Sequence, residues 1–267
     1  MIREPAVAGR FYSADPEALG REIRAFAEPA GPQFAALAVL VPHAGYMYSG
    51  SIAGAVYAAV ALPKRFIVLG PNHTGWGAPL SLHPPGQWRT PLGVATIDAE
   101  LTEALHSADR ALALDAAAHR QEHSLEVQVP FLQVLAGDFS LAALCIGTTD
   151  LEKLETLGHA LAHVIRGCEE PVLLVASSDM NHYEPAEICS RKDQKAIERM
   201  EALDARGLHQ VIGDEDISMC GYAGTVSVLT ACRDLGASKA RLVRYGNSGE
   251  INGDFRRVVG YAGMTFR

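Results

Sequence analysis

The sequence predicts an α/β fold in which a central, mostly parallel or mixed sheet is flanked by helices. Across its 267 residues, short apolar runs of strand length alternate with longer segments of helical spacing. Parallel strands and their crossover helices produce this order. Three of the apolar runs, 37–41, 66–69 and 172–176, end directly in polar loops. No internal repeat, low-complexity linker or charge run divides the chain, so residues 1–267 are expected to form one domain.

Helices are predicted from capping residues and from the spacing of apolar positions. Asp15 and Pro16 are an N-cap and a first-turn proline, which predict a helix from there to about Ala27. A stretch of small residues predicts a second helix at 51–60. The remaining helices are expected at 99–107, 124–135, 151–166, 186–202, 204–212 and 222–235.

Strands are predicted where apolar residues run together, or alternate with polar ones, between turn signals. The turn Pro84-Pro85-Gly86 separates a strand at 79–83 from another at 94–97. The other strands are expected at 36–41, 65–70, 140–146, 172–176, 240–246 and 256–266.

Composition and charge argue against several classes of protein. Hydrophobic residues make up 48% and charged residues 20%, the balance of a packed enzyme rather than of a disordered segment. The net charge of −8 comes with no basic stripe, so no nucleic-acid partner is expected. Without a run of about 18 uncharged apolar residues or an apolar signal core, no membrane association is expected. Five cysteines without a CxxC pair predict free thiols, a reducing compartment and a cytoplasmic location.

Histidine and aspartate side chains follow the three apolar runs at the points where those strands should end. His43 follows the first run, His73 the second, and Asp179 with His182 the third. If the strands are parallel, these loops leave one edge of the sheet, where open α/β sheets bind ligands. A single histidine after a strand is more often a satisfied core or capping residue. Several at successive strand ends favour a metal site or an acid–base site.

Cys220 is a further candidate for this site. It precedes Gly221 at the start of a predicted helix, where the helix dipole and free amides favour a thiolate that could ligate a metal or act as a nucleophile. Asp179 could orient an imidazole, and a protonated His182 could donate to a developing anion. The other four cysteines are expected to be small buried side chains: Cys145, Cys168, Cys189 and Cys232.

A second polar cluster lies at 122–126. Ser124 could cap the predicted helix that follows, and a capping network that includes His123 and Glu126 would account for the cluster. The alternative is that His123 or Glu126 faces the site and binds substrate.

Seven segments together resemble the signatures of the Memo family, in the family's order and over nearly the whole chain. They are Arg3–Tyr12, Pro42–Gly50, Leu69–His73, Glu122–Glu126, Pro130–Leu132, Ser177–Asp179 with His182, and Cys220–Gly221. In prokaryotes this family is also called AmmeMemoRadiSam system protein B, which implies an AMMECR-like protein and a radical SAM enzyme as partners. The family's fold is similar to that of class III extradiol dioxygenases, so the resemblance implies this fold here.

The resemblance also implies a set of metal ligands. The family's ligands correspond to His43, His73 and Cys220, with Asp179 and His182 beside the ion as catalytic residues. Where the dioxygenases have a carboxylate, this sequence has Cys220, and a thiolate shifts the preference toward copper or zinc. The implied cofactor is a divalent or redox metal ion, with iron favoured and copper or zinc as alternatives. A related fold does not by itself imply ring cleavage.

Three functions are consistent with these residues, in order of preference. The first is a non-haem iron- or copper-dependent redox enzyme that acts on an unknown small molecule, with His182 as acid–base catalyst and Asp179 orienting it. The second is a metal-free hydrolase with Cys220 as nucleophile and His182 or His43 as base. The third is a non-catalytic protein that binds a peptide or a partner, as the adaptor role of animal relatives implies.

Overall fold

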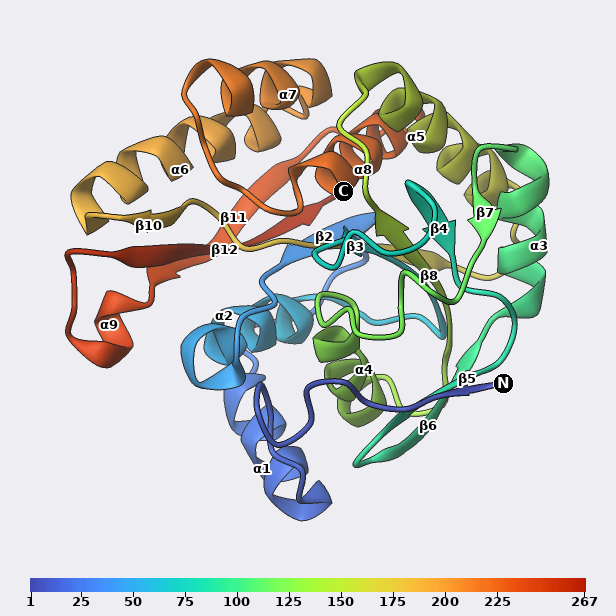
Figure 1. Ribbon diagram of the computed structural model, residues 1–267, viewed down its shortest axis with the longest axis horizontal. Helices are drawn as coiled ribbons and strands as arrows, with labels where there is room; N and C mark the ends of the chain where they lie inside the picture. The colour runs from blue at the N-terminus through green and yellow to red at the C-terminus, as the bar shows by residue number, and fades with distance from the viewer.

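Four parallel strands form the centre of a 12-stranded sheet in the computed structural model, which describes residues 1–267 (Figure 1). In spatial order they are β8 (Ser140–Ile146), β3 (Arg65–Pro71), β9 (Val172–Ser177) and β2 (Ala38–Val41). Nearly every residue in them is buried. Continuous apolar runs are typical of strands that are covered on both faces.

The sheet is mixed, because its two flanks add antiparallel strands. Beyond β2, the long strand β12 (Val258–Phe266) runs antiparallel and pairs in turn with β11 (Ala240–Asn247) and β10 (His182–Glu184). The short strands on the other flank are β1 (Ile2–Arg3), β4 (Leu80–Leu82), β5 (Gln87–Thr90), β6 (Gly93–Ile97) and β7 (Ala113–Leu114).

Successive side chains of the central strands point to opposite faces of the sheet, so the core is divided into two layers. In β2, Ala38 and Leu40 belong to one apolar cluster, whereas Val39 and Val41 belong to the other. One face of the sheet is covered by α3 (Ala99–Ala108), α5 (Leu151–Arg166), α6 (Ala186–Glu201), α7 (Ala205–Asp214) and α8 (Tyr222–Asp234). The opposite face is covered by α1 (Pro16–Phe26), α2 (Tyr46–Ala59) and α4 (Val129–Leu135) (Figure 1). The predicted fold class is therefore confirmed.

The helices follow their sequence signals closely, with one difference at the start of α2. Asp15 caps α1 as predicted, because its carboxylate accepts a hydrogen bond from the backbone N–H of Ala18. Helix α2 begins at Tyr46 rather than at 51 and contains Gly54, whose Cα lies against the backbone of Phe26 in α1. Glycine lowers helix propensity, but here its missing side chain allows close helix packing. None of the helices combines the length and the apolar character needed to cross a membrane.

Other differences come from short or interrupted elements. The helix predicted at 124–135 is a 3-10 turn, η1 (Glu126–Gln128), followed by α4, in which Pro130 occupies the first turn where its missing N–H costs nothing. Strands β5 and β10 were not predicted, since each is only three or four residues long and owes its extended form to pairing with a neighbour. The four-residue helix α9 (Gly249–Asn252), between β11 and β12, was not predicted either.

The strand register brings the polar loops together. Leu40 of β2 and Leu69 of β3 both pair with Ala176 of β9, which lies between these two strands. His43 comes three residues after Leu40 in the chain, and Asp179 comes three residues after Ala176. The loops after β2, β3 and β9 therefore leave the same edge of the sheet.

Two other histidines, His83 and His119, lie fully inside the protein next to Trp88. Their ring centroids are 5.1 Å apart. Burial lowers the pKa of His83 to about 4 and that of His119 to about 3. Both rings are thus neutral in the folded protein at pH 7.

These pKa shifts predict a fold that loses stability in mild acid. Each folded-state pKa lies below the unfolded value of about 6.5, so the unfolded chain binds more protons as the pH falls below 6.5, and the stability present above that pH is lost. We expect the free energy of unfolding in urea to fall between pH 7.5 and pH 5, with His119 alone contributing roughly 2 kcal/mol. His119→Met should make this dependence shallower, whereas His163→Met on the exposed face of α5 should not. An unchanged slope in His119→Met would contradict the prediction.

Candidate metal centre

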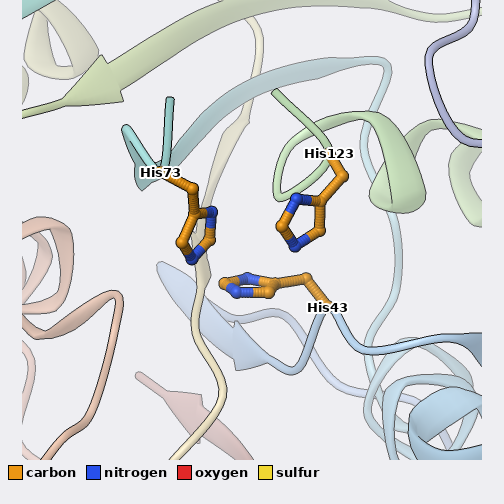
Figure 2. A group of neighbouring side chains, drawn as sticks. All are labelled: His43, His73 and His123. Carbon is orange, nitrogen blue, oxygen red and sulfur yellow. The ribbon is translucent and has the colours of Figure 1, made fainter. Parts of the chain in front are cut away.

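Three histidines converge at the edge of the sheet where the loops after β2, β3 and β9 begin. His43 follows β2, His73 follows β3, and His123 lies in the segment before η1. One ring nitrogen from each lies within 4.8 Å of the others. Figure 2 shows the rings coming from three separate segments, with one nitrogen of His73 and one of His123 on the sides that face His43. This group could hold a metal ion.

The hydrogen bonds of Ser177 determine which nitrogen of His43 is free. The Ser177 hydroxyl donates to the backbone carbonyl of Ser124 at 2.6 Å and accepts from Gln128 Nε2 at 2.9 Å. A hydroxyl has one proton to donate, so the contact of 3.0 Å between Ser177 Oγ and His43 Nδ1 requires that Nδ1 carry the proton. The Nε2 atom of His43 therefore has a free lone pair. Burial, and then the nearby His123 and His73, lower the pKa of His43 well below its usual value.

Glu122 determines which nitrogen of His73 is free. Its carboxylate accepts from His73 Nδ1 at 2.8 Å, from the His73 backbone N–H at 2.6 Å and from the Ser124 backbone N–H at 2.9 Å. Burial alone would raise the pKa of Glu122, but the contacts with His73 and Ser124 outweigh it and hold the pKa at about 2. An ionised carboxylate only accepts, so Nδ1 of His73 is protonated and Nε2 is free, as in carboxylate–histidine–metal arrangements.

Glu122 was not among the functional residues predicted from the sequence. Its position immediately before His123, in the family-like segment Glu122–Glu126, was the available signal.

His123 completes the group but is held differently. Its ring stacks on His73 with centroids 4.6 Å apart, and it contacts the ring of Phe11 at 4.8 Å. Its Nδ1 lies 3.5 Å from Glu122 Oε1, a longer contact than that of His73. Burial lowers the pKa of His123 to about 4, so this ring is neutral at pH 7.

Cys220 contacts the same group from the start of α8. Its Sγ lies 3.1 Å from His43 Nε2, the nitrogen left free by Ser177. Burial, and then the charge of Asp179, raise the pKa of the Cys220 thiol. The sequence predicted that the start of the helix favours a thiolate, but burial favours the neutral thiol. Without a metal, Cys220 is a thiol that donates to His43, and a bound cation would compete for its proton.

Asp179 and His182 follow β9, at the same edge of the sheet as the three histidines. Asp179 Oδ1 accepts from the backbone N–H groups of His43 and Ala44 at 2.7 and 3.2 Å, so it holds the loop rather than an imidazole. Burial raises the pKa of Asp179 to about 6 against these hydrogen bonds. His182 Nδ1 donates to the backbone carbonyl of Ser218 at 2.8 Å, which leaves its Nε2 free on a partly exposed ring.

Glu126 is bound by the N-terminal segment and not by the three histidines. Its Oε2 accepts from Arg3 Nη1 at 2.7 Å and from the Ala6 backbone N–H at 2.8 Å. Its Oε1 accepts from the Tyr12 hydroxyl at 2.7 Å and from the Val7 backbone N–H at 3.0 Å. The carboxylate expected to bind substrate is therefore fully occupied by the N-terminal segment.

The contacts of Glu122 predict a strong effect on metal affinity. Glu122→Gln keeps the shape of the side chain but places an amide donor against N–H groups that need an acceptor, so the His73 ring should lose its orientation. We expect the affinity for a divalent metal to fall about 10- to 100-fold, the usual effect of removing such a partner, with the fold retained. Calorimetric titration of Glu122→Gln against the wild type measures this, with exposed Glu198→Gln as the control. Equal affinities would contradict the role given to Glu122.

Comparison with known proteins extends the resemblance seen in the sequence. A family model described as "Memo-like protein" matches residues 3–265. The MEMO1 family protein MK0963 of Methanopyrus kandleri is 39% identical over 281 residues, covering 100% of this chain and 99% of that protein. A MEMO1 family protein of Aquifex aeolicus is 42% identical over 268 residues, covering 99% of both.

A solved structure shares the fold. The crystal structure of the uncharacterized protein JW3007 from Escherichia coli K12 matches with a TM-score of 0.54 and 14% identity, covering 84% of this chain and 98% of that one. At this identity the similarity concerns the fold alone.

Proposed function

Because this chain belongs to the Memo family, we propose that it is a metal-dependent redox enzyme that binds one iron or copper ion and acts on a small molecule. The Nε2 atoms of His43 and His73 and the ring of His123 would hold the ion, with Cys220 as a further ligand. The observation that carries this proposal is the convergence of the three rings, two of them with their free nitrogen assigned by a hydrogen-bond partner.

The donor set fits such an ion. Neutral imidazoles suit iron, copper and zinc, and a sulfur ligand adds preference for copper or zinc over hard cations. The low pKa values of His43 and His123 keep these rings unprotonated, as ligation requires. When bound, the ion supplies redox and Lewis-acid chemistry next to these side chains.

The surrounding residues have separate roles. Asp179 keeps the backbone of His43 in place through two hydrogen bonds. His182, whose Nε2 is free, accepts or returns a substrate proton. Cys220 Sγ, 3.1 Å from His43 Nε2, would be a further ligand as a thiolate, with its proton released to solvent.

A metal-free hydrolase is the second candidate, favoured by one observation. The 3.1 Å contact between Cys220 Sγ and His43 Nε2 has the geometry of a thiol–imidazole pair. Burial raises the pKa of the thiol and lowers that of the imidazole, which disfavours the thiolate–imidazolium form that a nucleophile needs. The hydrolase therefore ranks below the metal enzyme.

Metal analysis of protein purified anaerobically from its native host tests the proposal. Anaerobic work matters because oxidation of Cys220 would remove a ligand. We expect about one iron or copper per chain, and absorption changes on oxidation and reduction. Protein that carries no metal but hydrolyses esters or thioesters, and loses this activity in Cys220→Ala, would support the hydrolase instead.

A further inference from the structure

The N-terminal segment, Arg3–Tyr12, is anchored on the carboxylate of Glu126. The four hydrogen bonds to this carboxylate come from Arg3, Ala6, Val7 and Tyr12, at 2.7 to 3.0 Å. The ion pair is buried, with side-chain exposures of 4% for Arg3 and 1% for Glu126. One buried carboxylate thus holds a segment more than a hundred residues away in the chain.

Arg3 also holds the segment that carries His123. Its Nε donates to the backbone carbonyl of His119 at 2.7 Å, and its Nη2 donates to the backbone carbonyl of Glu122 at 2.7 Å. With the ion pair to Glu126, a single guanidinium contacts this segment at three points on both sides of His123.

Phe11 connects the N-terminal segment to the metal-binding group. Its ring lies 4.8 Å from the ring of His123, at an interplanar angle of 53°. Its backbone carbonyl accepts from the Tyr46 N–H at 2.7 Å, at the start of α2 and three residues after His43. Phe11 therefore contacts the segments of two of the three histidines.

His123 has particular need of such a contact. His43 and His73 are oriented by hydrogen bonds of 3.0 and 2.8 Å on their Nδ1 atoms. His123 Nδ1 has only the longer contact of 3.5 Å with Glu122, whose carboxylate already binds His73 and Ser124. The orientation of the His123 ring thus depends on the aromatic rings around it.

We propose that the N-terminal segment positions His123 in the metal-binding group, with Phe11 as the positioning residue and Glu126 as its anchor. This inference rests on the proposed metal site. It also gives a physical role to the Arg3–Tyr12 signature, because this segment closes over His123 from a distant part of the chain and fixes the ring in its ligating position.

Titration with Co²⁺ under reducing, anaerobic conditions tests the proposal, because the visible bands of Co²⁺ report its coordination. The proteins compared are the wild type, Phe11→Ala, His123→Ala, the double variant, and Phe139→Ala. Phe139 is a matched control, since it is also partly buried and packs on Phe66 at the opposite edge of the sheet. We expect Phe11→Ala to bind about 10-fold more weakly than the wild type with altered bands, and Phe139→Ala to bind normally.

The double variant separates positioning from a general effect on the fold. If Phe11 acts through His123, Phe11→Ala should add nothing to the loss in His123→Ala. Wild-type affinity in Phe11→Ala, or an equal further loss in the double variant, would overturn the inference while leaving the metal site intact. A wild type that takes up no Co²⁺ would overturn the proposed metal site and this inference with it. Should Phe11→Ala not fold, Phe11→Leu should show a smaller loss in the same direction, and unchanged affinity in it would overturn the inference.

Discussion

Replacing His43 with alanine should abolish tight metal binding, with an affinity loss of more than about 100-fold. His43 is the one ring that contacts both other histidines and also Cys220. Removing a hydrogen-bond partner of a metal ligand costs about 10- to 100-fold in affinity. Removing His43 should cost more, because the ligand itself is gone. Metal content after dialysis and Co²⁺ titration measure the effect, with His163→Ala on the exposed face of α5 as the control. Unchanged stoichiometry and affinity in His43→Ala would exclude this group as the metal site.

Two further variants identify the remaining ligands. The sequence and the family resemblance predicted His43, His73 and Cys220, whereas the three imidazoles that the structure groups include His123. We expect His123→Ala to lose more affinity than Cys220→Ser, which keeps all three rings. The opposite order would favour the ligand set predicted from the sequence.

The second large effect is on stability. Glu126→Ala should lower the free energy of unfolding by about 3–5 kcal/mol, because it leaves the buried guanidinium of Arg3 without its counter-charge. Three other N–H and O–H groups lose their acceptor at the same time. Urea unfolding of the apo protein measures the difference. Glu155→Ala, which breaks the exposed pair with Arg206, is the control and should change stability much less. A similar small effect in Glu126→Ala would mean that the N-terminal segment adds little to the fold.

Much of the fold could be predicted because the signals are local. The apolar runs at 140–146 and 172–176 are the observed β8 and most of β9. The predicted helix at 151–166 has the observed bounds of α5, where Asp150 caps the first turn. Short strands such as β10 were missed because their extended form depends on pairing with a distant strand, here β12. Such pairing leaves no periodic pattern in the local sequence.

The part of the candidate site that could be predicted is the part that follows directly from parallel strands. His43 and His73 follow the two strands that flank β9, so their proximity follows from strand order and register. His123 lies in a segment that belongs to no strand, and its path depends on contacts with Arg3. The partners of Glu126 could not be predicted for the same reason, since a buried ion pair across more than a hundred residues leaves no local pattern.

The position of β9 also limits when the site can form during synthesis. Strands β2 and β3 follow each other closely in the chain, yet β9 lies between them in the sheet. A nascent chain that ends before Val172 therefore lacks the strand that sets His43 and His73 at their mutual distance. At about 5–20 residues per second, the ribosome needs roughly 9–35 s to reach Ser177. Until then the group of histidines is incomplete, so the proposed metal ion should be inserted late, after the sheet has assembled.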